Sequence, residues 1–463
     1  MTGADEGEAV LQEAHELARA FLRSLPERPV GATGTLQELR AGADRPLTDE
    51  GVSATEVIGD LNALAESGVV ASAGPRYFGF VIGGSYPVSV AADWLVSAWD
   101  QNPGIHATSP FGAVVEEAAA RYVLDVLRLP PQATVGFTTG CQMANFTALA
   151  AARHKLLADV GWDVESEGLN GAPPINVVIG AESHVTIHTA LRYLGLGLKH
   201  AKRVPADGQG RMIVKELEKT LATCSGPTIV CVQAGNVNSG AFDPLDEVAA
   251  LANARGAWMH VDAAFGLWAR ATKEHAQLAR GAELADSWAT DAHKWLNVPY
   301  DCGIVIVKHG QAHRDAMAVR AAYLEHAAHA ERDEFEYVPE FSRRGRSIPV
   351  YATLRHLGRR GVAELIERCC SHARRFAETL GREEGVEILN DVVLNQVLVR
   401  FGDSDELTRE VIVRVQHEGT CWLGGTTWRG KAAMRISVSN WSTTAEDVDR
   451  SARAIITAYS ASR

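Results

Sequence analysis

The sequence predicts an α/β protein in which helices cover a mostly parallel sheet. The first observation is that short apolar runs alternate with helical patterns between about residues 90 and 345, as such a sheet requires. The second is that polar side chains stand at the ends of these runs, as Asp262 does after the run from Trp258 to Val261. In α/β folds, strand ends of this kind carry the chemistry.

Three sections follow from the pattern along the chain. We expect a helical N-terminal segment over residues 1–89, a large domain over 90–345 and a small α/β domain over 346–463. The N-terminal segment has helical periodicity at 8–24 and at about 48–68, and a stretch rich in glycine and proline closes it.

Some individual boundaries are also predicted. Thr48-Asp49-Glu50 is a plausible start of the second helix, because short polar side chains accept hydrogen bonds from the first turn of a helix. In the last section the alternation VVLNQVLVRF predicts a strand, a helix follows at 404–418, and AAMRISVSNW predicts another strand.

Composition restricts the class of protein. The chain has 463 residues, of which 46% are apolar, and this is enough for a large buried core. Its formal net charge of −12 argues against nucleic acid or a membrane surface as the main partner. No apolar run is long enough to span a bilayer, and the N-terminus lacks the basic start and apolar stretch of a signal peptide.

The seven cysteines show no spacing typical of a disulfide framework or of a zinc site. They are odd in number and lie in apolar surroundings, which favours reduced thiols and a cytoplasmic location. We therefore expect no bound metal.

One stretch decides the function. Residues 260–266 read HVDAAFG, and residues 291–303 read DAHKWLNVPYDCG. Taken alone, the HKW triplet would be a surface basic pair beside a core tryptophan. Together with the aspartate stretch upstream, the two segments resemble the pyridoxal-phosphate-dependent group II amino-acid decarboxylases, the family that includes aromatic amino-acid and glutamate decarboxylases.

The resemblance covers about Pro75 to Trp441 and implies a fold-type I enzyme with pyridoxal 5'-phosphate as cofactor. By the resemblance, Lys294 holds the cofactor as a Schiff base and Asp262 pairs with the pyridine nitrogen. A carboxylate there keeps that nitrogen protonated, so that the ring can delocalise the electrons of a carbanion at the substrate α-carbon. Further cofactor contacts are expected from Ala264, Asp291 and His293.

The chemistry also requires that the amine of Lys294 can become neutral. An amine attacks an aldehyde only in its neutral form, so we expect the pKa of Lys294 to be lowered by burial or by nearby cations.

A second stretch predicts an anion site. The run from Thr134 to Thr139 ends at Gly140, and Cys141 and Gln142 open the helical pattern of FTALAAARHKLL. A strand, a glycine turn and a helix start bring unpaired backbone N–H groups to one spot. Relatives usually read TSGGSEAN where this chain reads TTGCQMAN. Backbone donation to the cofactor phosphate should survive this change, and Gln142 is a guess for a side-chain contact.

The third stretch is SHVTIH at residues 183–188. In the family a histidine here stacks on the pyridine ring, and the spacing to the following ALRYLGLG matches His184 to that position, with a catalytic role. His188 is the competitor. Aminotransferases of the same fold generally stack an aromatic residue there, so His184 favours decarboxylation.

The charged segment at 325–347 has no clear periodicity and is expected to be a mobile surface loop. In the family, a tyrosine of this loop protonates the substrate carbon after CO₂ leaves. Tyr337 is the first choice for this catalytic role and Tyr323 the second. A surface or interface role is the alternative for both.

The substrate is poorly specified. By the resemblance, Phe80, Val81 and His106 line the substrate pocket, the last from a partner subunit, which gives a mixed apolar and polar lining. An aromatic or other medium-sized L-amino acid is the first choice and an acidic one the second. The products would be the amine and CO₂.

The apolar N-terminal helices need a partner surface, and in the family they pack against a second subunit. A homodimer with a shared active site is therefore expected. Three alternatives stay open. An aminotransferase would clamp the substrate carboxylate with Arg435, an aldehyde synthase of the same family would release peroxide and ammonia, and a non-catalytic protein would only bind the cofactor or a partner.

Overall fold

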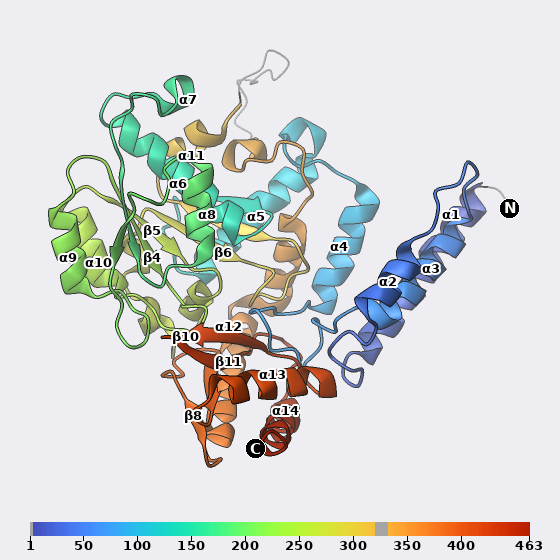
Figure 1. Ribbon diagram of the computed structural model, residues 1–463. Helices are drawn as coiled ribbons and strands as arrows, with labels where there is room; N and C mark the ends of the chain where they lie inside the picture. The colour runs from blue at the N-terminus through green and yellow to red at the C-terminus, as the bar shows by residue number, and fades with distance from the viewer. Residues whose placement is uncertain (1–2, 320–331) are drawn as a thin grey trace.

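The computed structural model describes residues 3–319 and 332–463, so Tyr323 lies outside the described residues. At its centre is a seven-stranded sheet with helices on both faces (Figure 1). A smaller sheet lies toward the C-terminus, and the N-terminal helices lie beside α4 (Pro87–Trp99). The predicted fold class, an α/β protein with a mostly parallel sheet, is confirmed.

The large sheet has the strand order β1-β7-β6-β5-β4-β2-β3. Within the described residues, only β7 runs against its neighbours, β1 and β6, and the other neighbouring pairs are parallel. The strands are β1 (Thr134–Thr138), β2 (Asn176–Gly180), β3 (Lys202–Val204), β4 (Thr228–Gln233), β5 (Trp258–Asp262), β6 (Ser287–Asp291) and β7 (Gly303–Val307).

Both faces of this sheet are buried, and the strand residues alternate between two apolar layers. On β4, Val230 and Val232 belong to one layer, whereas Ile229 and Cys231 belong to the other. The second layer includes α6 (Cys141–Ala158) and α8 (Val185–Tyr193). Successive side chains of a strand point to opposite faces, so the position of a residue along its strand decides which helices it meets.

Helix α6 is central: it contacts β5, β6, β7, α8 and α11 (Gly310–Met317). Its many alanines favour the helix and allow close approach of its neighbours. The other helices here are α5 (Pro110–Val126), α7 (Val164–Glu167), α9 (Val214–Ala222) and α10 (Leu245–Asn253), with the short 3₁₀ turns η1 (His106–Thr108), η2 (Gly266–Ala271), η3 (Ala276–Ala279), η4 (Ala282–Leu284) and η5 (Glu334–Tyr337).

The C-terminal part contains an antiparallel sheet in the order β10-β11-β9-β8. The long helix α12 (Ser347–Leu380), which leads into it, is interrupted at Gly358, whose φ of +60° costs glycine little. The predicted helix and strands of this part are present. Its elements are β8 (Val386–Ile388), β9 (Gln396–Phe401), α13 (Asp405–Glu418), β10 (Gly424–Trp428), β11 (Lys431–Ser437) and α14 (Ala445–Ser460).

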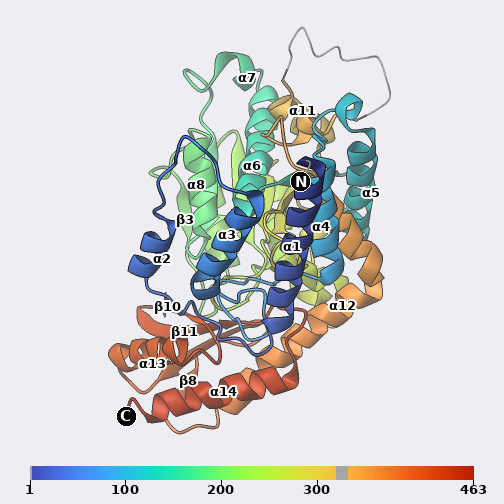
Figure 2. The same cartoon turned by 90° about the vertical axis from the view of Figure 1, so that its right-hand side faces the viewer.

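At the N-terminus, α1 (Gly3–Ser24) and α3 (Ala54–Gly68) lie side by side (Figure 2). Helix α3 starts later than expected, because the side chain of Ser53 accepts the cap hydrogen bond from the N–H of Glu56. The sequence analysis missed α2 (Leu36–Ala43), although Thr35 and Glu38 form a capping box. In the part of the chain that the structure covers, no helix is both long and apolar enough to cross a membrane.

A buried arginine ties this N-terminal section to the C-terminal part. Arg76 is 1% exposed, and its guanidinium donates hydrogen bonds to the carbonyl oxygens of Pro26, Arg28 and Thr420. A buried guanidinium is tolerated when acceptors meet its N–H groups in this way. Segments from opposite ends of the chain therefore meet at one side chain.

The expectation of a surface loop at 325–347 is wrong for the described part of that segment, which packs against β1 and α11 through η5. Its charges are paired inside the protein. Arg343 lies 2.6 Å from Glu116, with both side chains fully buried, and Arg332 lies 2.8 Å from Glu334. Charged side chains are expected at the surface only when the interior of the protein offers them no partner of opposite charge.

Glu116 and Glu334 form a pair of buried carboxyl groups. Glu116 Oε2 and Glu334 Oε1 are both buried without a hydrogen-bond partner among the described residues. Burial, and next the neighbouring Glu116, raise the pKa of Glu334 well above its ordinary value of 4.5. The raised pKa favours the protonated, neutral form of Glu334 above pH 4.5.

This proton makes stability depend on pH. Folded Glu334 holds a proton that the unfolded chain releases above its ordinary pKa of 4.5, so Glu334 lowers the free energy of unfolding as the pH rises beyond that value. Glu334→Gln is neutral at every pH and should flatten this decline, which makes the variant more stable than the wild type at mildly alkaline pH. Urea unfolding across a pH series measures the effect. The neighbouring Glu336→Gln is the control, and parallel curves for Glu334→Gln and wild type would refute the raised pKa of Glu334.

Candidate active site

Two aspartates end neighbouring parallel strands on the same face of the sheet. Asp262 is the last residue of β5 and Asp291 the last of β6, and they are 5% and 1% exposed. Trp258 on β5 and Ala289 on β6 belong to the layer of α6 and α8. Alternate residues of a strand share a face, so both carboxylates point toward these helices.

Lys294 lies just beyond β6, and its Nζ is 3.0 Å from Asp291 Oδ2. Burial opposes its charge, but the Asp291 carboxylate, with a smaller contribution from Asp262, raises the pKa of Lys294 above its ordinary value of 10.5. The expectation of a lowered pKa is therefore wrong for this structure. The sequence did not reveal that the nearest charges to the amine are carboxylates.

Cys141, the first residue of α6, contacts both carboxylates. Its backbone N–H donates to Asp291 Oδ1 at 2.6 Å, and its thiol donates to Asp262 Oδ1 at 3.5 Å. Burial raises the pKa of Cys141 well above its ordinary value, so Sγ keeps its proton. Among the described side chains, this thiol is the one donor to the Asp262 carboxylate.

The start of α6 has the backbone geometry on which the prediction of an anion site depends. Gly140 precedes the helix without a side-chain cap, which leaves the N–H groups of Gln142 and Met143 without an acceptor inside the helix. Gly303 of β7 makes this turn possible, because a Cβ there would lie 2.3 Å from the carbonyl carbon of Gly140. The side chain of Gln142 makes no hydrogen bond to the described residues.

His184 precedes α8 and lines a small cavity. The other residues that line this cavity are Gln233, Gly235, Val237, Asp262, Ala264, Phe265 and Lys294. Burial lowers the pKa of His184, although Asp262 opposes this, so the ring is neutral. His188, the competitor, instead pairs with Ser183 Oγ at 3.0 Å and is not part of this lining. The structure thus brings His184, Asp262, Ala264 and Lys294 to one cavity.

His293 lies on the other side of Asp291. Its ring stacks on that of Tyr300 with centroids 4.3 Å apart, and its Nδ1 accepts a hydrogen bond from the Cys302 N–H at 3.0 Å. The proton of the neutral ring is therefore on Nε2, 3.4 Å from Asp291 Oδ1. Burial lowers the pKa of His293, in agreement with a neutral ring.

The sequence analysis missed Gln233, which ends β4 opposite Asp262 and lines the same cavity. It closes the apolar run TIVCVQ, the same signal that identified Asp262. Arg435 of β11 was considered only as a feature of an aminotransferase. Its Nη1 donates to the carbonyl oxygen of Val237 at 3.4 Å, its Nε is buried without a partner, and burial lowers the pKa of Arg435.

The predicted pocket residues Phe80 and Val81 lie next to the lysine segment but outside the cavity lining. Phe80 is 60% exposed and stacks on Trp422, whereas Val81 is buried. Their φ angles of 52° and 62° are unusual for bulky side chains, and such strain is typical of functional segments. In the same segment, a Cβ on Gly83 would lie 1.8 Å from the carbonyl oxygen of Lys294.

His106 and Tyr337 lie elsewhere in the chain. The backbone N–H of His106 donates to Asp333 Oδ1 at 2.8 Å. The Tyr337 ring is 7% exposed, with its centroid 5.3 Å from that of His313 and 3.8 Å from the guanidinium carbon of Arg332. Within one chain, the described residues therefore do not bring Tyr337 to the cavity at Lys294.

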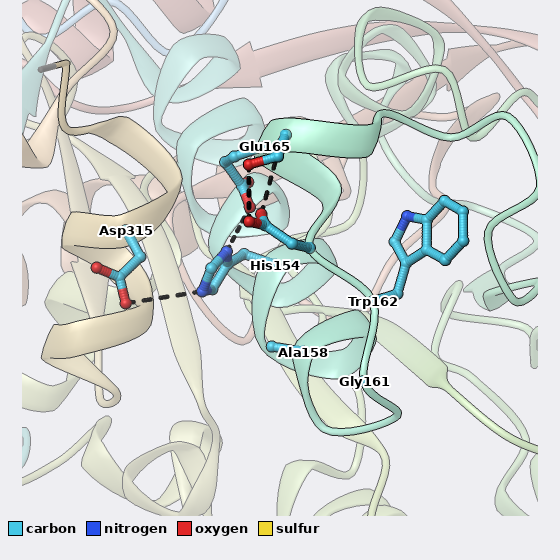
Figure 3. Close-up of a pocket in the computed structure, with 8 residues that line it drawn as sticks. His154, Ala158, Gly161, Trp162, Glu165 and Asp315 are labelled. Atoms are coloured by element: carbon cyan, nitrogen blue, oxygen red, sulfur yellow. Dashed lines mark hydrogen bonds and ion pairs between the residues drawn. The ribbon is translucent and has the colours of Figure 1, made fainter.

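A larger cavity, of about 640 Å³, lies between the end of α6, α7 and α11, away from Lys294 (Figure 3). His154 stands there between two acids, with Nδ1 2.5 Å from Glu165 Oε2 and Nε2 3.7 Å from Asp315 Oδ2. The hydrogen bond to Glu165 raises the pKa of His154. This cavity contains none of the predicted site residues, so size alone does not locate the chemistry.

Comparison with known proteins identifies the family of the chain. Residues 37–401 match the model of the pyridoxal-dependent decarboxylase conserved domain. The chain is 25% identical to an aromatic-L-amino-acid decarboxylase of Bacillus atrophaeus over 460 residues, which cover 96% of this chain and 94% of that protein. It is 30% identical to an L-2,4-diaminobutyrate decarboxylase of Rhizobium meliloti over 383 residues, which cover 79% and 74% of the two chains.

Solved structures agree on the fold. A structure of Oryza sativa TDC with PLP and tryptamine superposes with a TM-score of 0.92 at 21% identity and covers 99% of both chains. The 4-hydroxyphenylacetaldehyde synthase of Rhodiola rosea gives a TM-score of 0.88 at 22% identity, again over 99% of both chains. The chain therefore belongs to the pyridoxal-dependent decarboxylase family and is a pyridoxal-phosphate-dependent amino-acid decarboxylase.

Proposed function

We propose that this decarboxylase acts on an L-amino acid with an aromatic or other medium-sized side chain and releases the amine and CO₂. The observation that carries the amino-acid part of the proposal is the guanidinium of Arg435, whose Nε is buried without a partner, whereas the choice of side chain rests on the exposed rings described below. The guanidinium has no carboxylate partner among the described residues, and its carbonyl partner Val237 lines the cavity at Lys294. Such a cation suits the α-carboxylate of an amino acid.

The rings near the cavity support an aromatic side chain. Tyr300, which stacks on His293, is 59% exposed, and Phe80 exposes its ring beside the lysine segment. Exposed rings of this kind offer flat apolar contact area to a second ring. The likeness to the aromatic-L-amino-acid decarboxylase of Bacillus atrophaeus, which extends over nearly the whole chain, points the same way.

The residues around Lys294 fit pyridoxal phosphate, and we assign their roles on that basis. Asp262 is a carboxylate for the ring nitrogen, the neutral His184 is a flat partner for the ring, and the N–H groups at the start of α6 suit the phosphate. Ala264 leaves room beside Asp262, and Lys294 supplies the amine. When bound, the cofactor supplies a ring that accepts the electrons left on the α-carbon.

The remaining residues of the site hold these groups in place. Cys141 fixes Asp262 through its thiol and Asp291 through its backbone N–H. His293 Nε2 lies beside the same Asp291 oxygen. Lys294 must lose a proton before it can attack an aldehyde, and Asp291 Oδ2, 3.0 Å from Nζ, is the nearest group that can accept it.

We also propose a homodimer in the cytoplasm, with domains at 1–89, 90–345 and 346–463. Large apolar side chains are exposed on α1, α3, α4 and α5, which favours a covered surface. All seven cysteines are free thiols, as a reducing compartment would keep them. The exposed apolar residues on these helices are Leu11, Val57, Leu61, Trp94, Leu95, Trp99, Phe111 and Val114.

A panel of aromatic, acidic and diamino L-amino acids tests the function. We expect amine and CO₂ in equal amounts, with the highest kcat/KM for an aromatic member. Lys294→Ala should lose this turnover, whereas Lys308→Ala, outside the site, should keep it. CO₂, amine, aldehyde and keto acid are measured together. A keto acid formed in place of CO₂ would contradict decarboxylation, and a preference for acidic members would contradict the substrate class.

The charge of Asp291 should control the attachment of the cofactor. Asp291→Asn removes the carboxylate that raises the pKa of Lys294, so the neutral amine should form at lower pH. Pyridoxal phosphate is added to the cofactor-free protein, and the rate at which borohydride fixes it on Lys294 is followed against pH. Asp286→Asn, just before β6, is the matched control. If the Asp291→Asn profile coincides with that of the wild type, Asp291 does not set this pKa.

The proposal that Tyr337 donates the final proton has the least support from the geometry, and a single substitution tests it. Tyr337→Phe should still release CO₂, but the carbon that lost it then lacks its acid and reacts with oxygen. The product should therefore shift from amine to aldehyde. Amine, aldehyde and peroxide are measured together. An unchanged amine yield would leave Tyr337 as a packing residue against His313.

A further inference from the structure

A continuous line of hydrogen bonds connects His184 to the sheet beneath it. Its inner members are completely buried, and no step of the proposed function uses them. Buried polar groups are costly unless each one finds a partner, so the donors and acceptors along the line must alternate. Beyond His184 the line contains Thr186 on α8, Asn145 on α6, His260 on β5, Ser287 on β6 and Trp258 on β5.

Two groups that can only donate hydrogen bonds fix which atoms donate and which accept along this line. At one end, the backbone N–H of Thr186 donates to His184 Nδ1 at 3.4 Å, so Nδ1 carries no proton in the neutral ring. At the other end, the indole N–H of Trp258 donates to Ser287 Oγ at 2.8 Å.

The hydrogen bonds between these ends then follow one by one. The Thr186 hydroxyl, 2.9 Å from His184 Nδ1, must donate to it, and its oxygen accepts from Asn145 Nδ2 at 3.3 Å. The amide therefore turns its Oδ1 toward His260 Nε2, which donates at 2.9 Å. His260 Nδ1 accepts from the Ser287 hydroxyl at 2.9 Å. Every polar group of the line is satisfied in this arrangement.

We propose that Thr186, Asn145 and His260 are positioning residues that hold His184 as the tautomer with its proton on Nε2. This inference rests on the proposed function, in which His184 lies against the cofactor. Because Nδ1 contacts Thr186 of α8, Nε2 is the ring nitrogen left for another partner. An N–H group there donates to an oxygen of the bound substrate or cofactor and does not remove a proton from it, so His184 orients its partner and is not a base.

The protonation of the two rings agrees with this assignment. Burial lowers the pKa of His260 to about 3, and burial also lowers the pKa of His184. Both rings are therefore neutral near neutral pH, and the choice of tautomer is the remaining variable.

Nitrogen NMR of the protein labelled with ¹⁵N-histidine reads the tautomer directly. The spectrum is recorded for the cofactor-free and the loaded protein, and the His184 signals are assigned by their loss in His184→Gln. We expect an unprotonated Nδ1 and a protonated Nε2 for His184 in the wild type. A protonated Nδ1 in the wild type would overturn the proposal.

Variants of Thr186 separate positioning from packing. Thr186→Val keeps the shape of the side chain and removes the hydroxyl, so the two tautomers of His184 should mix. A fall in kcat of about tenfold with a smaller change in KM should follow, as expected for one lost hydrogen bond. Thr186→Ser keeps the hydroxyl and should restore both readouts. Equal His184 spectra for the Val and Ser variants would overturn the proposal.

Asn145→Asp tests the direction of the line. The new carboxylate can only accept, so the Thr186 hydroxyl should turn toward it and away from His184, which changes the signals of His184 and His260 together. His313 is the internal control, because it is fully buried, like His260, but pairs with Thr134 Oγ1 at 2.8 Å. Unchanged His184 signals in Asn145→Asp would contradict the assigned direction.

These NMR measurements need no turnover, so they separate the two proposals. If no amino acid is decarboxylated, the proposed function fails while the tautomer of His184 can still be read. If turnover is normal and Nδ1 carries the proton, only this inference fails.

Discussion

Burial of both faces of the large sheet is the constraint on which the rest of the structure depends. Side chains in the layer between the sheet and α6 and α8 are screened from water, so each polar group there must find a partner in the protein. Asp262 and Asp291 meet Cys141 and Lys294 at the strand ends. The site is thus the accessible end of a set of hydrogen-bonded polar groups that continues into the apolar layer.

Asp291 organises the charges at that accessible end. Its carboxylate meets the Cys141 N–H, the Lys294 amine and the His293 ring. A hydrogen bond to a charged group contributes roughly 1.5 to 3 kcal/mol, whereas leaving one charge of a buried pair without its partner costs about 3 to 5 kcal/mol. The cost of isolation is the larger effect. This cost explains why Lys294 is held as a cation beside Asp291, although its amine must become neutral before it attacks an aldehyde.

Features that depend on local sequence patterns could be predicted from the sequence. The alternation of apolar runs identified the sheet, and Lys294, Asp262 and His184 were found from short motifs beside those runs. Features that depend on distant partners were not predictable in this way. The raised pKa of Lys294 depends on how the Asp291 side chain is directed. Burial of Arg343 depends on Glu116, 227 positions away, and the partner of His260 is Asn145, 115 positions away.

The contact of Arg76 with the carbonyl oxygen of Thr420 also has a consequence for the order of events during synthesis on the ribosome. The two residues are 344 positions apart, and chain elongation at about 5–20 residues per second separates their appearance by roughly 20 to 70 s. Throughout that interval the arginine has no Thr420 carbonyl to bind. The N-terminal helices therefore cannot reach their final attachment until nearly the whole chain has emerged, and chaperones that shield apolar surfaces have that interval in which to act.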